Sequence, residues 1–203
     1  MPGSRRSHGA SRPPIDGVLL IDKPVGLTSH DVVARIRRLI GQRAVGHTGT
    51  LDPNASGLLA LVLGRATKLA SLLTGGDKTY EATIRLGVGT DTDDTEGVPL
   101  GTPVTDLPDS AAVEAALEGF RGSFDQIPPQ HSAKKIGGEK AYDLARRAEP
   151  FQLAPVRVTV RALTWEGREG DLVRVRVTAA AGFYVRALAR DLGATLGCGG
   201  HLF

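Results

Sequence analysis

The sequence contains one loop-like stretch in which an acidic side chain stands among small residues. Residues 46–57 read GHTGTLDPNASG, and Asp52 is the only carboxylate among them. The proline that follows Asp52 disfavours helical backbone angles at the residue before it, so Asp52 should lie on an extended or turn backbone. A carboxylate presented in this way can attack an electrophilic carbon or transfer protons. The stretch therefore predicts Asp52 as a reactive group.

Few other side chains could carry out the chemistry. Ser56 lacks the GxSxG frame of a serine hydrolase. The single cysteine, Cys198, excludes an internal disulfide, and no Cys/His spacing is typical of a zinc site. The aspartates of residues 87–97, GVGTDTDDTEG, do not follow the ligand order of an EF-hand, so we expect a solvated loop there.

Three residues are candidate partners of Asp52. Arg186 could keep the carboxylate charged, Tyr80 could stack on a flat substrate, and His47 could supply a neighbouring polar contact. Each residue also has an ordinary structural role. A strand tyrosine often packs in the core, a histidine beside glycines often bonds to a loop, and an aspartate before proline often forms a turn. The residues alone leave both interpretations open.

Apolar patterning predicts the elements that must position these residues. Strands are predicted at 17–22, 58–63, 78–86, 156–165 and 171–179, with a turn at 166–170 between the last two. The first should be a buried strand, the second a strand buried on both faces, and Tyr80 should face the core. Helices are predicted at 28–40, 66–73, 109–120 and 187–196, the first beginning with a Thr28–Asp31 cap.

Composition limits the class of protein. A length of 203 residues with 41% apolar content is enough for one substantial domain or two small ones. A net charge of +3 and a pI near 9.2 suit a polyanionic partner. Residues 1–14 lack the apolar core of a secretory signal and are expected to be a disordered leader. No apolar run approaches the roughly twenty residues of a membrane span, so a soluble protein is expected. The single cysteine favours a reducing cytoplasm.

The region 121–149 differs from the rest of the chain in its apolar pattern and in its charge. It has little apolar periodicity and places cations, including Lys134, between His131 and Tyr142. A mobile arm that closes on a nucleic acid fits this pattern. An ordinary surface excursion is the alternative.

Five motifs together resemble the tRNA pseudouridine-55 synthase (TruB) family. They are GVLLIDKPVGLTSHDVV, GHTGTLDPNASG, KTYEA, HSAKKIGGEKAYDLAR and GFYVRALARDLGATLGCGGHL, in this order from residue 17 to the end. The resemblance implies isomerisation of a uridine at position 55, in the T-loop of tRNA, to pseudouridine after the base is flipped out. It implies no metal or organic cofactor, and a monomer is expected.

The resemblance also implies roles for the residues of the reaction site. Asp52 matches the family's essential aspartate, Tyr80 the tyrosine stacked on the target base, and Arg186 the arginine that pairs with the aspartate. His47 matches a histidine that helps hold the flipped-out nucleotides, and Lys23 of the DKP motif is a weaker structural or active-site match. The chemical route stays open between attack on the sugar, addition to the base, and proton transfer after glycal formation.

Further RNA contacts are expected from His131, Lys134 and Tyr142, in a thumb-like RNA-binding insertion at about 123–151. The implied fold is α+β, a long mixed, largely antiparallel sheet flanked by helices and loops, with the catalytic domain at 15–203. The carboxy-terminal RNA-binding (PUA) domain of the family is expected to be absent from this chain. Two other functions remain open: a non-catalytic RNA-binding or tRNA-folding module, and a pseudouridine synthase acting on another RNA.

Overall fold

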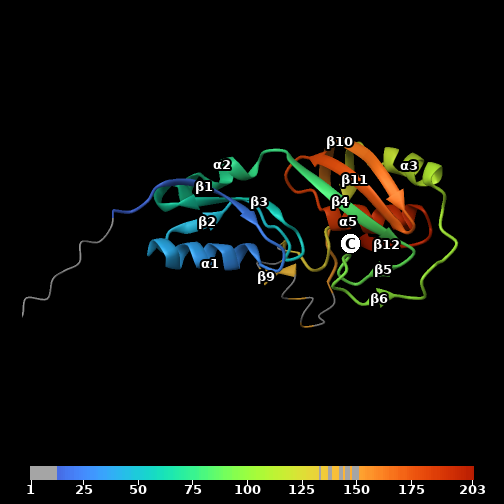
Figure 1. Cartoon of the computed structure of the whole chain (residues 1–203), viewed down its shortest axis with the longest axis horizontal. Coiled ribbons are helices and arrows are strands. Elements are labelled where there is room, and N and C mark those ends of the chain that lie inside the picture. The colour runs from blue at the N-terminus through green and yellow to red at the C-terminus, as the bar shows by residue number, and fades with distance from the viewer. Residues whose placement is uncertain (1–12, 133, 137–138, 142–143, 145–146, 148–150) are drawn as a thin grey trace, which may run out of the picture. The chain divides into compact units, whose positions relative to one another are not determined.

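The computed structural model describes residues 13–132, 134–136, 139–141, 144, 147 and 151–203. The chain divides into two compact units, Met1–Gly75 (unit 1) and Gly76–Phe203 (unit 2) (Figure 1). Tyr142, predicted to contact RNA, and nearly all of the predicted leader lie outside the described residues.

Unit 1 is a three-stranded antiparallel sheet with a helix on one face (Figure 1). The strands β1 (Gly17–Lys23) and β2 (Val45–His47) flank β3 (Gly57–Leu63). Helix α1 (Ser29–Ile40) packs Val32 and Val33 against apolar side chains of β2 and β3. A 3-10 helix (Gly64–Leu69) and α2 (Ala70–Thr74) follow β3, where one continuous helix at 66–73 was predicted.

Helix α1 begins with the predicted capping pair. The Thr28 hydroxyl accepts a hydrogen bond from the Asp31 amide at 3.0 Å, and the Asp31 carboxylate accepts one from the Thr28 amide at 2.9 Å. These bonds satisfy amide groups that have no partner within the helix. The helix ends at Gly41, whose φ of 66° is left-handed and suits glycine. The start and end of α1 thus follow from local sequence.

The prediction that β1 and β3 are buried strands was wrong for part of one face of the sheet, on which only Val62 of β3 is fully buried. Val18 and Leu20 of β1 are 51% and 63% exposed, and Leu58 of β3 is 68% exposed. Side chains alternate between the two faces of a strand, and α1 covers only the face that carries Leu59 and Leu61. An uninterrupted apolar run therefore did not mean burial on both sides.

Unit 2 is built on a five-stranded antiparallel sheet in the order β12-β4-β11-β10-β7. The bounds of these strands are Gly200–Leu202, Lys78–Leu86, Leu172–Ala179, Val156–Glu169 and Gly122–Gln126. Helices α3 (Ser110–Glu118) and α5 (Val185–Thr195) pack on the sheet and share one core with it (Figure 1). Strand β4 has the predicted bounds, and Tyr80 packs against this core as predicted.

The hairpin of β10 and β11 is longer than predicted. Residues 166–169, expected to form a turn, extend β10, and Glu169 pairs with Leu172. The connection is therefore only Gly170 and Asp171, and the φ of Gly170 is 59°. Two register shifts in β10 take up extra residues as bulges, which strand periodicity does not reveal.

Short strands complete unit 2. β5 (Gly89–Thr90) pairs with β6 (Pro99–Leu100), and β8 (Lys135–Ile136) pairs with β9 (Glu139–Lys140). Residues 123–126, at the beginning of the predicted insertion, lie in β7 of the main sheet. The α+β class is confirmed. In the part of the chain that the structure describes, no helix is both long enough and apolar enough to cross a membrane.

Candidate active site

Asp52 lies at the start of a tight turn between β2 and β3. The Ala55 amide donates to the Asp52 carbonyl at 3.1 Å and closes a four-residue turn. Pro53 occupies the second position of this turn, where its fixed φ is suited. The Asp52 side chain is half-buried. The expectation that Asp52 lies on a turn backbone is therefore confirmed.

The residue before Asp52 is held by a buried hydroxyl. Ser29, 1% exposed at the start of α1, accepts from the Leu51 amide at 3.0 Å and donates to the Leu51 carbonyl at 3.2 Å. One side chain thus satisfies both polar groups of the Leu51 main chain. The position of the Asp52 backbone is thereby tied to the first turn of α1.

The residue after Asp52 is held by a buried ammonium group. Lys23 is fully buried at the end of β1 and donates to the carbonyls of Leu27, Pro24 and Pro53 at 2.7, 3.0 and 3.4 Å. The Gly26 amide also donates to Pro53, at 2.8 Å. Burial lowers the pKa of the Lys23 ammonium, and the charge of Asp52 partly offsets this effect. Lys23 and Asp52 therefore interact electrostatically within unit 1.

His47 ends β2, a few residues before Asp52. Its half-buried ring contacts the ring of His30 edge to face, with 5.3 Å between the centroids. His30 is exposed in the first turn of α1. His30 was not predicted as a site residue, because its segment matches a helix cap.

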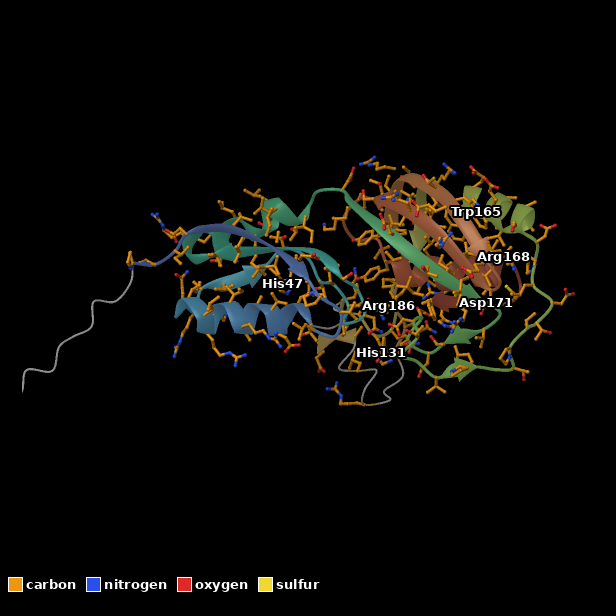
Figure 2. All side chains as sticks on the ribbon, in the orientation of Figure 1. His47, His131, Trp165, Arg168, Asp171 and Arg186 are labelled. Carbon is orange, nitrogen blue, oxygen red and sulfur yellow. The ribbon has the colours of Figure 1, made fainter. Side chains whose placement is uncertain are left out.

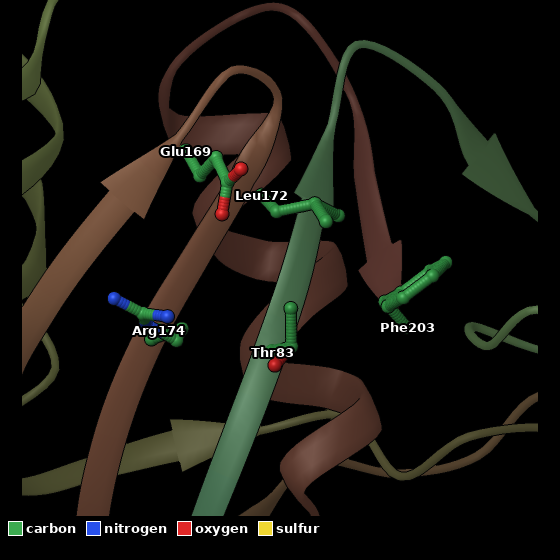
Figure 3. A pocket seen from close by; sticks show the side chains of 5 residues that line it. All are labelled: Thr83, Glu169, Leu172, Arg174 and Phe203. Carbon is green, nitrogen blue, oxygen red and sulfur yellow. The ribbon is translucent and has the colours of Figure 1, made fainter.

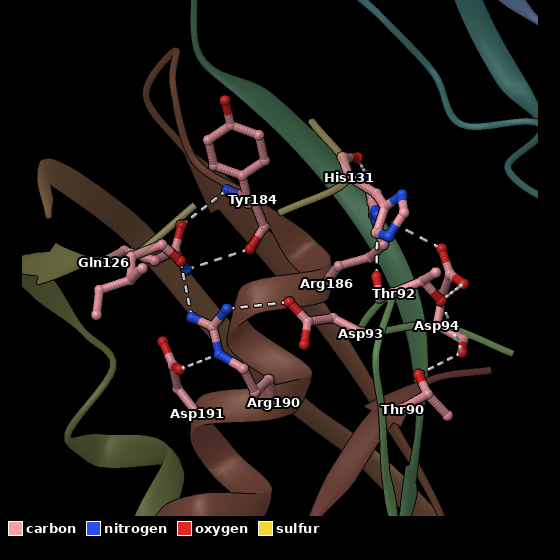
Figure 4. Close-up of polar contacts among 11 residues, drawn as sticks. Thr90, Thr92, Asp93, Asp94, Gln126, His131, Tyr184, Arg186, Arg190 and Asp191 are labelled. Atoms are coloured by element: carbon pink, nitrogen blue, oxygen red, sulfur yellow. Dashed lines mark hydrogen bonds and ion pairs between the residues drawn. The ribbon is translucent and has the colours of Figure 1, made fainter. Parts of the chain in front are cut away.

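In unit 2, Arg186 is a buried cation with a defined set of contacts. Its Nη1 donates to the Thr92 carbonyl at 3.0 Å, and its Nη2 donates to the His131 carbonyl at 2.9 Å. The Oδ2 atom of Asp94 lies 3.6 Å from Nη1 (Figure 4). Figure 2 labels Arg186 and His131 on the ribbon of this unit. Arg186 thus joins α5 to two loops.

The start of α5 is fixed by Gln126, the last residue of β7. This fully buried amide donates to the Tyr184 carbonyl at 3.2 Å and accepts from the Tyr184 amide at 2.9 Å (Figure 4). Tyr184 is the residue that precedes the helix. Because Arg186 follows two residues later, Gln126 limits where its guanidinium can reach.

The prediction that residues 87–97 form a solvated loop was wrong for part of the segment, although Asp91, Thr95 and Glu96 are exposed as expected. Thr90 and Asp93 are 5% and 7% exposed, and the Asp94 side chain is 16% exposed. This part of the loop is buried because Thr92 and Asp93 contact arginines of α5 that lie more than 90 residues away in the sequence. Asp93 and Asp94 were not predicted as site residues, since an acidic turn-rich segment normally indicates solvent exposure.

The residues predicted in the RNA-binding arm are only partly described. His131 is half-buried, and its main chain contacts Arg186. Lys134 is exposed, and its carbonyl accepts from the Ala141 amide at 2.7 Å. Tyr142 lies outside the described residues. A role in RNA binding remains a prediction for all three.

The structure brings together two groups of predicted site residues. Unit 1 holds Asp52 with Lys23, and unit 2 holds Arg186 with His131. Tyr80 of β4 is half-buried opposite Val177 of β11 in unit 2. The pairing of Asp52 with Arg186 or Tyr80 remains a prediction, because it joins residues of different units.

Two hollows lie in unit 2. One, of about 370 Å³, is lined by Thr90, Asp91, Asp93, Leu100, Gln130 and Arg190, beside the contacts of Arg186. The other, of about 170 Å³, is lined by Thr83, Glu169, Leu172, Arg174 and Phe203 (Figure 3). None of the predicted site residues lines the second hollow. In the described ranges, no three His, Cys, Asp or Glu side chains are grouped as a metal site would require.

Comparison with solved structures identifies relatives of this fold. The chain superposes on a chain of a Cbf5-Nop10-Gar1 complex with a TM-score of 0.70 and 30% identity, over 92% of this chain and 46% of that one. A chain of an H/ACA RNP bound to a substrate RNA containing 2'-deoxyuridine gives a TM-score of 0.66 and 27% identity. That superposition covers 92% of this chain and 45% of the other.

Curated relatives are more similar in sequence. The tRNA pseudouridine synthase B of Thermobifida fusca (strain YX) is 51% identical over 92% of this chain and 67% of its own length. The enzymes of the same name from Mycobacterium sp. (strain KMS) and Aromatoleum aromaticum (strain DSM 19018 / LMG 30748 / EbN1) are 50% and 48% identical. The two alignments cover 92% and 93% of this chain, and 64% and 61% of the respective relatives.

The chain therefore spans about two thirds of the curated relatives that it matches. A family model described as TruB family pseudouridylate synthase (N terminal domain) matches residues 37–185, which include Asp52, His47, Tyr80 and the residues preceding Arg186. The motifs, the fold and the relatives agree, and the chain belongs to the TruB family of pseudouridylate synthases.

Proposed function

We propose that this chain isomerises a uridine in the T-loop of tRNA, at position 55, to pseudouridine. The observation that carries the proposal is the Asp52 turn, fixed on both sides by Ser29 and Lys23 in a member of the TruB family. Relatives named tRNA pseudouridine synthase B share 47–51% of their aligned residues with it, which supports tRNA as the substrate.

The reaction is an internal rearrangement of the nucleotide. The bond from the sugar to a ring nitrogen breaks, and a bond from the sugar to a ring carbon forms. The carbon loses a proton and the nitrogen gains one, so substrate and product have the same composition and no cofactor has to accept electrons. We assign the reactive carboxylate to Asp52, whose anchored backbone limits the directions in which its side chain can point.

Access to the target requires base flipping. A base stacked in a folded loop must be extruded, which costs a few kcal/mol that the protein has to offset. Tyr80 is suited to this role because it is half-buried, so that one part of the ring packs on the core while another part is accessible. We propose that this ring stacks on the flipped uracil. Loop RNA with unstacked bases is the class of target that such a contact recognises.

Arg186 is proposed to support the charge of Asp52. Its guanidinium is held by the Thr92 and His131 carbonyls before any substrate binds, so its position does not have to be organised during the reaction. The proposed RNA contacts are His47 in unit 1 and His131, Lys134 and Tyr142 in the arm at about 123–151. Lys23, also predicted to contact RNA, is fully buried, and we propose that it supports the Asp52 turn instead. We further propose a cytoplasmic monomer that acts without metal or organic cofactor.

One alternative has an observation in its favour. The solved relatives include a chain of an H/ACA RNP with bound substrate RNA, so a pseudouridine synthase for another RNA is the second candidate. The identities of 27–30% to those chains are well below the 47–51% to the tRNA pseudouridine synthases B, which favours tRNA.

The test is pseudouridine formation by the full chain on a synthetic T-arm hairpin. A hairpin with cytidine in place of the target uridine is the control, and a ribosomal RNA fragment of similar length is the competitor substrate. The proposal expects product in the T-arm hairpin only. Product in the ribosomal fragment alone would favour the second candidate. Tight binding to the hairpin without product would indicate a non-catalytic RNA-binding or tRNA-folding module.

A further inference from the structure

A second arginine lies one helical turn after Arg186 on α5. Arg190 donates from Nη1 to Asp93 Oδ2 at 3.0 Å, from Nη2 to the Ile127 carbonyl at 2.7 Å and from Nε to Asp191 Oδ1 at 2.8 Å. Its side chain is 30% exposed, whereas that of Asp93 is 10% exposed. All of these contacts lie within unit 2 (Figure 4).

Arg186 and Arg190 contact the same two segments. One is the loop at 90–94, where Arg186 bonds to Thr92 and Arg190 bonds to Asp93. The other is the segment at 127–131, whose two ends accept from Arg190 and Arg186 through the carbonyls of Ile127 and His131. Residues four apart lie on the same face of a helix, which explains how both side chains reach the same pair of segments. The two acceptor carbonyls of Arg186 are thus each carried by a segment that Arg190 also holds.

We propose that Arg190, paired with Asp93, is a positioning residue for Arg186: it fixes the loop at 90–94 and the segment at 127–131, and so sets the place of the Arg186 guanidinium. Arg190 acts through Arg186 and does not touch the substrate. This inference rests on the proposed function, because Arg186 must serve the isomerisation for its position to matter.

The conformation of Asp93 supports this role. Its φ is 63°, and among the described residues it is the only non-glycine residue with a positive φ. Aspartate is one of the few residues besides glycine that adopts this left-handed region readily, because its short polar side chain can hydrogen-bond nearby. Both main-chain polar groups of Asp93 are hydrogen-bonded. Its amide donates to the Thr90 carbonyl at 3.2 Å, and its carbonyl accepts from the Leu202 amide at 3.0 Å. The residue with this backbone conformation is thus the one that carries the carboxylate to Arg190.

The electrostatics of Asp93 agree with the geometry. Burial raises the pKa of its carboxyl, and the neighbouring Asp191 adds to this effect, while Arg190 and Arg186 oppose it. A buried carboxylate without a cation would be costly, so the pair is coupled. Loss of Arg190 should therefore disturb Asp93 and, through the same loop, the Thr92 carbonyl that Arg186 uses.

The experiment measures single-turnover pseudouridine formation on the T-arm hairpin at saturating protein, together with the hairpin Kd. The variants are Arg190→Gln, Arg190→Lys, Asp93→Asn, and Arg190→Gln in an Arg186→Lys background. Arg168→Gln is the matched control, because Arg168 also donates to main-chain carbonyls, those of Gly170 and Pro108, away from both segments. Circular dichroism and urea unfolding establish that each variant is folded at the assay temperature.

Arg190→Gln should lower the turnover rate about tenfold, because a small displacement of a charged group is enough to cost this much. The hairpin Kd should stay within about threefold, and Arg190→Lys should retain part of the rate because one ammonium can keep part of the contacts. Asp93→Asn should lower the rate in the same direction. In the Arg186→Lys background, adding Arg190→Gln should lower the turnover rate by less than about twofold relative to Arg186→Lys alone. The two effects should not be additive, because Arg190 acts through Arg186. The control should keep the parental rate.

A folded Arg190→Gln variant with the parental turnover rate would overturn the inference. The inference would also be overturned if Arg190→Gln lowered the rate by the same factor in the Arg186→Lys background as in the parent. A loss equal to that of Arg168→Gln would also overturn it, since the effect would then be one of general stability. These results leave the proposed function intact as long as the parent forms pseudouridine. A parent that forms none would remove the proposed function and this inference together.

Discussion

Ser29 and Leu51 are joined by two hydrogen bonds through one hydroxyl group, at 3.0 and 3.2 Å, although they lie 22 residues apart in the sequence. This contact fixes the peptide that precedes Asp52. Because the hydroxyl comes from the first turn of α1, the helix directly supports the turn that carries the proposed reactive carboxylate.

Ser29→Ala should destabilise unit 1 and reduce turnover. Alanine is a good helix former, so the cost should come from the Leu51 amide and carbonyl, which lose their buried partner. We expect a loss of about 1–3 kcal/mol in the free energy of unfolding, measured by urea titration. The single-turnover rate should fall because the Asp52 turn is less well fixed. Ser71→Ala, at an exposed position of α2, is the control and should change neither quantity.

Lys23 should make the stability of the protein depend on pH in the alkaline range. Burial lowers the pKa of its ammonium below the ordinary 10.5. Between the lowered pKa and 10.5, the unfolded chain binds more protons at this site than the folded chain does. The free energy of unfolding therefore rises with pH in that window.

The comparison that isolates this effect is the parent against Lys23→Met. The difference in free energy of unfolding should move in favour of the parent as pH increases toward 10.5. Lys68→Met, at an exposed position, provides the control curve. A difference between parent and Lys23→Met that stays constant with pH would contradict the assignment of Lys23 as a buried ammonium.

Arg186→Lys should separate charge from geometry. Lysine keeps the positive charge but cannot donate from two fixed nitrogens to the Thr92 and His131 carbonyls. Turnover on the T-arm hairpin should fall by about tenfold or more, while the hairpin Kd changes little. Arg157→Lys, in an exposed ion pair with Asp125, should keep the parental turnover. Unchanged turnover in Arg186→Lys would reject the proposed support of Asp52.

Gly193 of α5 should not tolerate a side chain. A Cβ at this position would lie 2.2 Å from main-chain atoms of Gly199 and Gly200, which cannot rotate away as a side chain could. Gly193→Ala should lower the free energy of unfolding by about 3 kcal/mol or more, since overpacking forces the backbone to shift. Gly75→Ala meets open space and is the control. Equal stability of the two variants would show that α5 can move away from β12.

The parts of the fold that were predicted correctly depend on local sequence. The Thr28–Asp31 cap, the alternation in β4 and the proline turn at Asp52 are each decided by neighbouring residues. The parts that were missed depend on distant partners. The exposed face of β1 follows from the number of helices that cover the sheet, which periodicity within the strand does not contain.

In the candidate site, too, the features set by neighbouring residues could be predicted and those set by distant partners could not. The turn at Asp52 could be predicted because it depends on adjacent residues, above all on Pro53. Asp93 and Asp94 were missed because their burial depends on Arg190 and Arg186, which only the fold brings to the acidic loop. Ser29 was assigned to a helix start, and nothing nearby indicates that its hydroxyl reaches Leu51.

The central claim is that Asp52 is indispensable for uridine isomerisation. The most direct test is pseudouridine formation on a T-arm hairpin by Asp52→Asn and Asp52→Ala, with hairpin binding measured on the same preparations. The claim predicts that both variants bind the hairpin within about threefold of the parent and form no pseudouridine, because the loss concerns the reacting group and not RNA contacts. Product formation by either variant near the parental rate would contradict it.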